Sequence, residues 1–458
     1  MKAPRRPRRP STSSFDVVVG ARTVISDPVA GPGPGGYQGC GRTARALLAA
    51  VLTASALAVC SHPTSPDAAI SPSASGGVSN LAIPADAFRQ EFEAILATID
   101  RYYALKELKG VDTAELRTRF GAEIERAGSA EAFYSVLVRL FAALHNSHSG
   151  LSLPGRAFAD AGIGTVLIGD RLVLTGEISD GALLDNGLTR GWEISAIDGV
   201  PFPVWLAQRG EFVSASTPQY RSVAAARQAT TRFWFERVER RFTFRSPAGA
   251  SLTLEVRLDR TPTAGGTQVL VTGRALGDVA YISVDSLSGD VVSQFEAELA
   301  KLVDKPALIL DLRRNSGGSS GLGLPIIAHL IDQPTRVEWP SQVLQPAASL
   351  RFTGHVAALV GPVTHSAAES LAHNLKDSGR ATFIGSPTAG STGNGPQFFQ
   401  TAQGIVFRLP TRPGIERSVS GAETEGAGLI PHIVKEQTYE DFLAGRDTAL
   451  EFALAFLR

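Results

Sequence analysis

The sequence predicts a multidomain protein, with a long leader followed by a helical domain, a β-domain and an α/β core. Three observations lead to this expectation. The chain has 458 residues, enough for about three domains. Its apolar residues recur first at helical spacing, then alternate with polar residues between glycines, and finally form short runs separated by helical segments. Its hydrophobic fraction of 43% is ample for packed cores. We place the boundaries at 1–80, 81–154, 155–262 and 263–458.

Residues 1–80 have the composition of a leader and a tether. Arg and Pro dominate the first ten residues, and "AGPGPGGYQG" at 30–39 cannot pack a core. The apolar run 46–59 follows two arginines, is too short for an ordinary membrane-spanning helix and suits a signal peptide. "LAVC" at 57–60 approximates a lipoprotein box, although Val59 departs from it. We therefore expect an exported protein, periplasmic or lipid-anchored through Cys60, with ordinary cleavage nearby as the alternative.

Charge and cysteine content exclude several classes of protein. Lys+Arg and Asp+Glu are both 44, so nothing indicates a nucleic-acid partner. A membrane would be contacted only through a lipid on Cys60. The two cysteines, Cys40 and Cys60, both precede the folded part, which excludes a structural disulfide or a cysteine metal site there. We expect no cofactor and no metal.

Residues 81–154 predict helices that end in a histidine loop. Two sets of apolar residues lie on helical faces, at 88, 92, 95, 99 and 102 and again at 133, 136, 137, 140, 141 and 144. The second set runs into "LHNSHSGL" at 144–151. His145 and His148 raise the alternative of a metal site, but no third ligand is evident nearby. His148 could also be an ordinary loop histidine bonded to backbone.

Residues 155–262 predict short strands separated by glycine turns. "GLTRGWEISAIDG" at 187–199 resembles the signature of PDZ domains, with Trp192 where Asp is common. PDZ domains bind extended peptides by adding a strand at a sheet edge. The resemblance implies a carboxylate-binding loop near Gly162, Ile163, Gly164 and Thr165. The alternative is a β-domain whose peptide groove is lost or unused.

Residues 263–458 predict an α/β sheet. Apolar runs at 279–284 and 307–312 read as strands and 291–303 as a helix. The second strand enters "RRNSGGSSG" at 313–321, whose glycines let backbone N–H groups face a ligand. A phosphate cradle is the alternative, but the P-loop lysine is missing.

Ser366 stands where an apolar strand, 356–360, gives way to a helix at 367–376. One interpretation is a capping serine, which Glu369 three residues later completes as a capping box. The other is a nucleophile, because free N–H groups at a helix start can hold a developing oxyanion. This stretch alone does not decide between them.

Four motifs in order resemble the tail-specific and tricorn-type serine peptidases, the C-terminal processing peptidase family. They are the loop at 144–148, the PDZ signature, "ILDLRRNSGG" at 309–318, and "THSAAES" with "RATFIGSPTAG" at 364–370 and 380–390; "ETEGAGLIPHI" at 423–433 closes the pattern. The resemblance covers 81–458. It implies an N-terminal helical domain, a PDZ-like β-domain and a catalytic core of the ClpP/crotonase-like type.

The resemblance also implies the catalytic residues. One branch of the family uses a lysine where this chain has Ser391, and Lys376 lies outside that motif. The tricorn-like branch uses a His preceded by Ser, here Ser147 and His148, and a late Glu, here Glu425. His148 would take the proton of Ser366, with Ser147 and Glu425 together orienting the imidazole. An imidazole base predicts activity rising through roughly pH 6 to 7.

The oxyanion donors are expected to be backbone amides. We predict Ala367 and Gly317, with Gly318 a close second. Ser316 replaces the first glycine of the family's triplet, and His432 replaces an Asp of structural role. His365 adjoins Ser366 but ranks below His148, because adjacent side chains on a turn rarely face each other.

The leading functional hypothesis is an exported serine endopeptidase that acts on polypeptides. A PDZ-like domain would select the substrate near C-termini. Two alternatives share the fold: an inactive module that binds apolar ligands, and a peptide-binding scaffold with a dead core. The oligomeric state cannot be read from the sequence.

Overall fold

The structure is a computed structural model that describes residue 70 and residues 77–154, 158–260, 269–338, 341–391, 395–414 and 417–458. The expected signal segment and Cys60 lie outside the described residues. Among the described residues, no helix is long and apolar enough to cross a membrane.

The described part of this segment contains three α-helices, the two that the apolar faces predict and a further one between them. They are α1 (Phe88–Tyr102), preceded by the short 3₁₀ helix η1 (Ala85–Ala87), α2 (Thr113–Arg126) and α3 (Ala130–Ala142). The apolar faces predicted for α1 and α3 are buried together, with Phe88 stacked on Phe133 at a ring-centroid distance of 4.3 Å. Side chains of Asp112 and Ser129 cap α2 and α3 at their N-termini.

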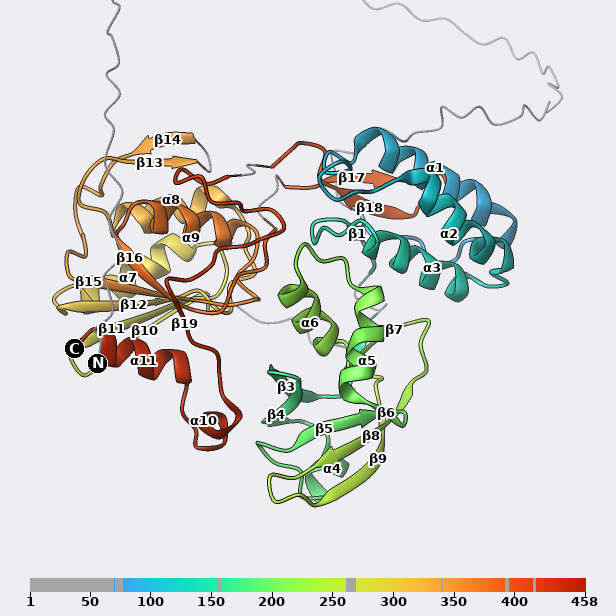
Figure 1. Ribbon diagram of the computed structural model, residues 1–458, viewed down its shortest axis with the longest axis horizontal. Coiled ribbons are helices and arrows are strands. Elements are labelled where there is room, and N and C mark those ends of the chain that lie inside the picture. The colour runs from blue at the N-terminus through green and yellow to red at the C-terminus, as the bar shows by residue number, and fades with distance from the viewer. Residues whose placement is uncertain are drawn as a thin grey trace, which may run out of the picture. The chain divides into compact units, whose positions relative to one another are not determined.

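A small sheet from late in the chain completes this helical core. β17 (Gln397–Gln400) pairs with β18 (Val406–Leu409), which in turn pairs with β1 (Gly150–Leu151). Phe399, Phe407 and Leu409 are fully buried among the helices. Figure 1 shows these orange-red strands beside the blue helices. Residues 397–409 thus pack away from the core segment in which the sequence places them.

The second segment is built on an antiparallel sheet, as the glycine-bounded strands predict. Its order is β3-β4-β5-β8-β9, with β6 on β5 and a separate pair of β2 and β7. The strands are β2 (Phe158–Asp160), β3 (Ile163–Ile168), β4 (Arg171–Ile178), β5 (Glu193–Ile197), β6 (Val200–Pro201), β7 (Thr231–Phe233), β8 (Glu239–Arg245) and β9 (Ser251–Arg257).

Helices also belong to this segment, which the alternating pattern did not reveal. They are α4 (Gly181–Asp185), α5 (Phe202–Arg209), the 3₁₀ helix η3 (Gly210–Phe212) and α6 (Pro218–Arg227). Thr217 caps α6 through its side chain and is followed by Pro218 at the first helical position. The alanines of α6 supply the buried contacts Ala225 and Ala226.

The third segment contains a six-stranded sheet of order β10-β11-β12-β15-β16-β19. β10 pairs antiparallel with β11, and the remaining pairs are parallel. The strands are β10 (Val271–Leu276), β11 (Val279–Val284), β12 (Ala307–Asp311), β15 (His355–Val360), β16 (Ala381–Gly385) and β19 (Ile433–Val434); β13 (Thr335–Glu338) and β14 (Ser341–Leu344) form a separate hairpin.

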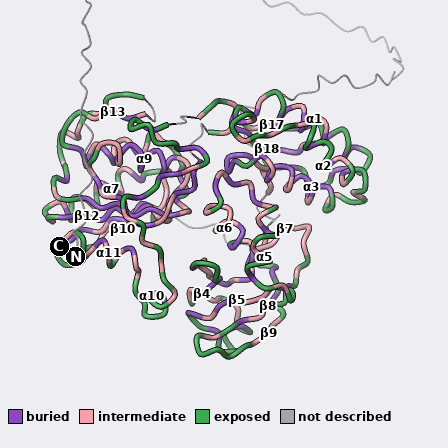
Figure 2. Tube along the Cα trace, in the orientation of Figure 1, coloured by how far each residue is buried: buried purple, intermediate pink, exposed green. Residues whose placement is uncertain are grey.

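Helices cover both faces of this sheet (Figures 1 and 2). They are α7 (Val291–Leu302), α8 (Ser320–Ala328), α9 (Ala367–Asp377) and α11 (Thr448–Phe456), whereas α10 (Tyr439–Leu443) packs against β3 and β4 through Phe442. Leu308 and Leu310 of β12 join the cluster that contains α7, α8 and α9, whereas Ala307 and Ile309 join the cluster that contains α11. This alternation explains the continuous apolar runs, because a sheet covered on both faces needs no polar side.

Candidate active site

Ser366 occupies the turn between β15 and α9. β15 ends at Val360 and α9 begins at Ala367. Ser366 has a φ of 57°, a conformation that costs a non-glycine residue about 1–3 kcal/mol. Glu369 Oε2 accepts the Ser366 backbone N–H at 3.2 Å, so the predicted capping pair is present. The strained turn places the hydroxyl at a helix start, where the first N–H groups have no helical acceptor.

His148 reaches Ser366 from the helical segment. Its Nε2 lies 2.8 Å from Ser366 Oγ, although the two residues are 218 positions apart in the chain. Asn146 Oδ1 accepts the His148 backbone N–H at 2.9 Å and thereby fixes the loop that follows α3. The His148 side chain is buried, with the residue only 6% exposed. The pair of side chains predicted as nucleophile and base therefore lies within hydrogen-bond distance.

The second imidazole nitrogen of His148 contacts a residue that the sequence did not assign to the site. Its Nδ1 lies 3.0 Å from Ser391 Oγ. Ser391 is fully buried, and its backbone N–H donates to Glu369 Oε2 at 2.9 Å. From the sequence, Ser391 marked only the absence of the lysine base. A serine at the position of the lysine base was the one sign in the sequence that Ser391 could belong to the site.

Ser147 does not orient His148, which corrects the prediction made for it. Its hydroxyl lies 3.0 Å from His365 Nε2 and 3.4 Å from Ser216 Oγ. The His365 Nδ1–H donates to the backbone oxygen of Ser316 at 3.2 Å, so Nε2 of a neutral His365 accepts the Ser147 hydroxyl proton. Adjacent side chains in a loop point in different directions, and Ser147 is turned toward the second histidine.

Glu425 does not orient the imidazole directly either, which corrects the joint role predicted for it and Ser147, because the two ring nitrogens of His148 contact Ser366 and Ser391. Glu425 Oε1 forms a buried ion pair with Lys109 Nζ at 2.7 Å and accepts from Asn146 Nδ2 at 3.1 Å. Since Asn146 holds the His148 backbone, Glu425 reaches the base through the amide of Asn146. Asn146 lies inside the histidine loop and could have been considered from the sequence. Lys109, in the loop after α1, carried no such signal.

Two of the three predicted oxyanion donors are available. The Gly317 N–H donates to Asn315 Oδ1 at 2.9 Å, so the first choice of Gly317 is wrong. Among the described residues, the N–H groups of Gly318 and Ala367 have no hydrogen-bond acceptor. Gly317 still shapes the site, since a Cβ at this position would lie 2.9 Å from the Ser366 Cβ. Its φ of 100° also requires glycine.

Burial dominates the electrostatics of the site. Desolvation, with smaller effects of His365 and Arg408, lowers the pKa of His148 to about 3. Burial likewise lowers the pKa of His365 to about 4. Both rings are therefore neutral above mildly acidic pH, and His148 can present a lone pair to a hydroxyl proton. Burial raises the pKa of Glu369 to about 7, against the lowering effect of its hydrogen-bond donors.

The remaining histidines and the nearby lysine have other contacts. The His365 ring stacks on Tyr220 of α6 at 5.2 Å and lies 5.0 Å from the His148 ring, measured between centroids. His432 Nδ1 accepts the backbone N–H of Phe383 in β16 at 2.9 Å, which is a structural contact. Lys376 donates to the backbone oxygen of Ile430 at 2.6 Å. It lies roughly 15 Å along α9 from Ser366 at 1.5 Å per residue.

The loop predicted to bind a peptide carboxylate has a different hydrogen-bonding pattern. The Gly162 N–H donates to Asp160 Oδ1 at 2.8 Å, and Ile163 and Thr165 pair with β4. Gly162 is therefore not a free donor, which corrects its assignment. Gly164 lies at the register shift between these paired residues. β3 itself is an edge strand of its sheet.

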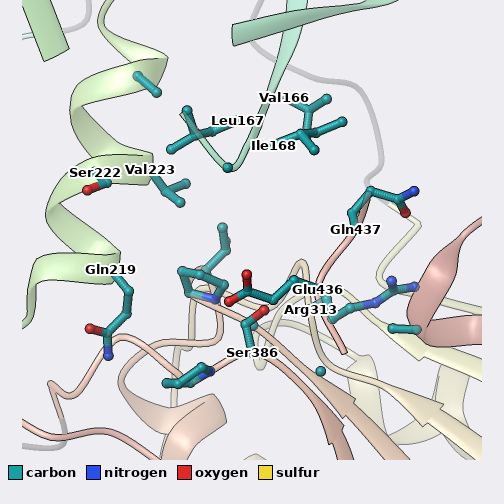
Figure 3. A pocket seen from close by; sticks show the side chains of 18 of the residues that line it. Val166, Leu167, Ile168, Gln219, Ser222, Val223, Arg313, Ser386, Glu436 and Gln437 are labelled. Carbon is teal, nitrogen blue, oxygen red and sulfur yellow. The ribbon is translucent and has the colours of Figure 1, made fainter. Parts of the chain in front are cut away.

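A cavity of about 450 Å³ lies along this edge strand. Residues from β3 and α6 form one wall, and the ends of the core strands form the other (Figure 3). The lining includes Val166, Leu167 and Ile168 from β3, Gln219 and Val223 from α6, and Ser386, Glu436 and Gln437 from the core.

A serine hydroxyl bonded to an imidazole at a helix start, beside free backbone amides, is the arrangement of serine hydrolases. The described residues contain no group of three side chains placed to hold a metal ion. Comparison with family models defines the class further. Residues 278–435 match peptidase family S41, and residues 84–142 match the tricorn protease C1 domain.

Two similar proteins are carboxyl-terminal-processing proteases. A carboxyl-terminal-processing protease of Picosynechococcus sp. is 28% identical over 245 residues, 46% of this chain and 55% of the relative. A carboxy-terminal-processing protease of Bartonella bacilliformis is 25% identical over 227 residues, 45% and 52% of the two chains. The chain spans about half the length of these relatives. The matched segments and these relatives support a C-terminal processing peptidase family.

Solved structures share the fold across most of the chain. Mature CPAF complexed with lactacystin has a TM-score of 0.68 at 15% identity, covering 81% of this chain and 97% of that one. Mature CPAF has a TM-score of 0.65 at 16% identity, covering 78% and 94%. At these identities the likeness shows the fold alone, a multidomain α/β fold with a helical N-terminal region.

Proposed function

We propose that this protein is a serine peptidase that hydrolyses polypeptides through an acyl-enzyme. The observation that carries the proposal is the 2.8 Å contact between Ser366 Oγ and His148 Nε2, at a strained strand-to-helix turn. The capping role of Ser366 and the nucleophilic role use the same turn. A cap needs no buried imidazole beside its hydroxyl, so the contact with His148 favours the nucleophile.

The geometry supports a two-step reaction. His148 Nε2 takes the hydroxyl proton while Ser366 Oγ attacks the scissile carbonyl carbon. The N–H groups of Ala367 and Gly318 bind the oxyanion. The imidazolium then gives its proton to the leaving amine, and the C–N bond breaks. In the second step water gives its proton to His148 and attacks the acyl carbon, and Ser366 Oγ recovers the proton as the acid product leaves.

The unpaired edge of β3 favours an extended polypeptide as the substrate. An edge strand offers backbone donors and acceptors to an added strand, and the cavity beside it continues to the core loop before Ser366. The PDZ-like segment would thus select substrates through backbone pairing with β3. The amide of Gly162 would not take part, because Asp160 occupies it.

The N-terminal sequence motivates the proposal that the protein is exported. The Arg-flanked apolar run ending in "LAVC" would direct export and a lipid on Cys60. Mass spectrometry of the mature N-terminus tests this. We expect a lipid-bearing Cys60 as the first residue, and an unmodified N-terminus beyond Cys60 would instead indicate simple secretion.

Labelling with a fluorophosphonate probe tests the catalytic proposal. Only an activated serine reacts with the probe, so we expect stoichiometric labelling of the purified chain. Peptide mapping should place the label on Ser366, and Ser366→Ala should abolish it while the variant remains folded by circular dichroism. A folded wild-type chain that takes up no label would overturn the proposal and favour a binding role.

A further inference from the structure

The imidazole of His148 lies between two serine hydroxyl groups. Ser366 Oγ is 2.8 Å from Nε2, and Ser391 Oγ is 3.0 Å from Nδ1. We infer that Ser391 is the positioning residue for His148 and accepts its Nδ1–H. This inference rests on the proposed function, and it assigns to Ser391 the role that the family resemblance implied for Ser147 and Glu425.

The tautomer of His148 decides whether Ser366 can be activated. With the proton on Nδ1, the lone pair on Nε2 faces the hydroxyl of Ser366 and can take its proton. With the proton on Nε2, it cannot. When Ser366 attacks, both ring nitrogens carry protons, and Nδ1–H then needs an acceptor. The Ser391 oxygen is the acceptor in contact with that nitrogen.

Glu369 fixes the position of Ser391 relative to Ser366. Its Oε2 accepts the backbone N–H of Ser391 at 2.9 Å and that of Ser366 at 3.2 Å. Its Oε1 accepts the Gly390 N–H at 2.6 Å and the Thr388 hydroxyl at 2.5 Å. One buried carboxyl oxygen thus joins the backbones of the two serines that contact opposite sides of the imidazole. These hydrogen bonds fix the positions of Ser366 and Ser391, and the His148 ring lies between their hydroxyl groups.

Ser147, the other candidate for orienting His148, forms its contacts with different residues. Its hydroxyl contacts His365 and Ser216. Among the described residues, no acidic side chain hydrogen-bonds to the His148 ring, so a neutral hydroxyl faces Nδ1 where many serine hydrolases have a carboxylate. A carboxylate introduced at position 391 would therefore favour the charged imidazole and raise its pKa.

The test compares four variants of the full chain: Ser391→Ala, Ser391→Thr, Ser391→Asp and Ser147→Asp. The fluorophosphonate labelling rate is measured from about pH 3 to 9. We expect Ser391→Ala to lose about 10- to 100-fold, the effect of loosening a catalytic group, and Ser391→Thr to restore most of that loss. The labelling rate falls in acid as His148 becomes protonated, and this fall is the acid limb of the pH profile. In Ser391→Asp the acid limb should move to higher pH, and in Ser147→Asp it should move less. A purely structural role for Ser391 would not move this limb.

A second readout does not depend on reactivity. In nuclear magnetic resonance spectra of the nitrogen-labelled chain, the His148 Nδ1–H proton should be protected from exchange at neutral pH. It should lose this protection in Ser391→Ala and keep it in Ser147→Ala. Protection that survives in Ser391→Ala, or an acid limb that responds to Ser147→Asp and not to Ser391→Asp, would overturn the inference. Failure of labelling in the wild type, with Nδ1–H still protected through Ser391, would refute only the peptidase proposal.

Discussion

Two histidines lie side by side at the candidate active site, and only one of them contacts the nucleophile. His365 precedes Ser366 in the chain, whereas His148 is 218 residues away and lies 2.8 Å from the Ser366 hydroxyl. His148 is buried and His365 is half-buried, and desolvation lowers the pKa of both. The difference is in their partners. The ring nitrogens of His365 contact Ser316 and Ser147, whereas those of His148 contact Ser366 and Ser391. Sequence adjacency therefore predicts little about which imidazole can serve as the base.

Replacing each histidine separately gives the largest expected difference. His148→Ala should lower labelling and peptide hydrolysis by about 10⁴-fold or more, as for other bases of this type. His365→Phe keeps a ring against Tyr220 and should lose far less. Lys376→Met serves as the control and should retain turnover. Full activity in His148→Ala combined with loss in His365→Phe would reverse the comparison, and loss in Lys376→Met would indicate a lysine base.

The pH profile sharpens the same comparison. The reaction needs neutral His148, and a pKa lowered to about 3 keeps it neutral throughout the mild pH range. Activity should therefore be nearly level between pH 5 and 7.5 and fall only in stronger acid, whereas an unperturbed imidazole would give a rise through pH 6 to 7. The measurement is the labelling rate in constant ionic strength. A tenfold rise between pH 6 and 7 would show that the imidazole is not desolvated as the structure has it.

A buried ion pair between Lys109 and Glu425 supports the loop that carries His148. We expect the loss of this pair to lower the free energy of unfolding, an effect with no counterpart at His365. The side chains of Lys109 and Glu425 are 8% and 1% exposed. Lys109→Met leaves Glu425 buried without its cation and should cost about 3–5 kcal/mol of unfolding free energy. The double variant Lys109→Met/Glu425→Gln should recover much of that cost. Denaturant unfolding measures both. Equal stability of the two variants would mean that the pair is not coupled.

The smallest effect concerns the turn that holds Ser366 next to His365. The φ of 57° is unfavourable for serine and favourable for glycine. Ser366→Gly should therefore be inactive yet more stable than Ser366→Ala by about 1 kcal/mol, at the lower end of the strain range. Thermal unfolding of the two inactive variants provides the comparison. A glycine variant less stable than the alanine variant would contradict the strain at this turn.

Elements with strong local patterns could be predicted from the sequence. The strand at 279–284 has the predicted bounds in the structure, and the helix predicted at 367–376 extends one residue further. The contact between Ser366 and His148 was predicted from motifs, because each motif is short and complete in itself. Resemblance supplied the pairing that periodicity cannot, since the two residues are far apart in the chain.

The remaining features depend on contacts that no local pattern records. The Asn315 side chain occupies the Gly317 amide, and Asp160 occupies that of Gly162. Both are side-chain-to-backbone bonds two residues apart, which compete with any ligand for the same donor. The turn of Ser147 toward His365 and of Ser391 toward His148 is set by tertiary packing. Propensity carries no information about it.

The late strands that complete the helical core have a consequence for the timing of synthesis. The helices that carry His148 bury their apolar faces against Phe399, Phe407 and Leu409, which the ribosome adds after Ser366. An emerging chain therefore holds the base loop on an unfinished support until residue 409 is available. On the proposed function, Ser366 and His148 meet only in a nearly complete chain, so the active site forms late in synthesis.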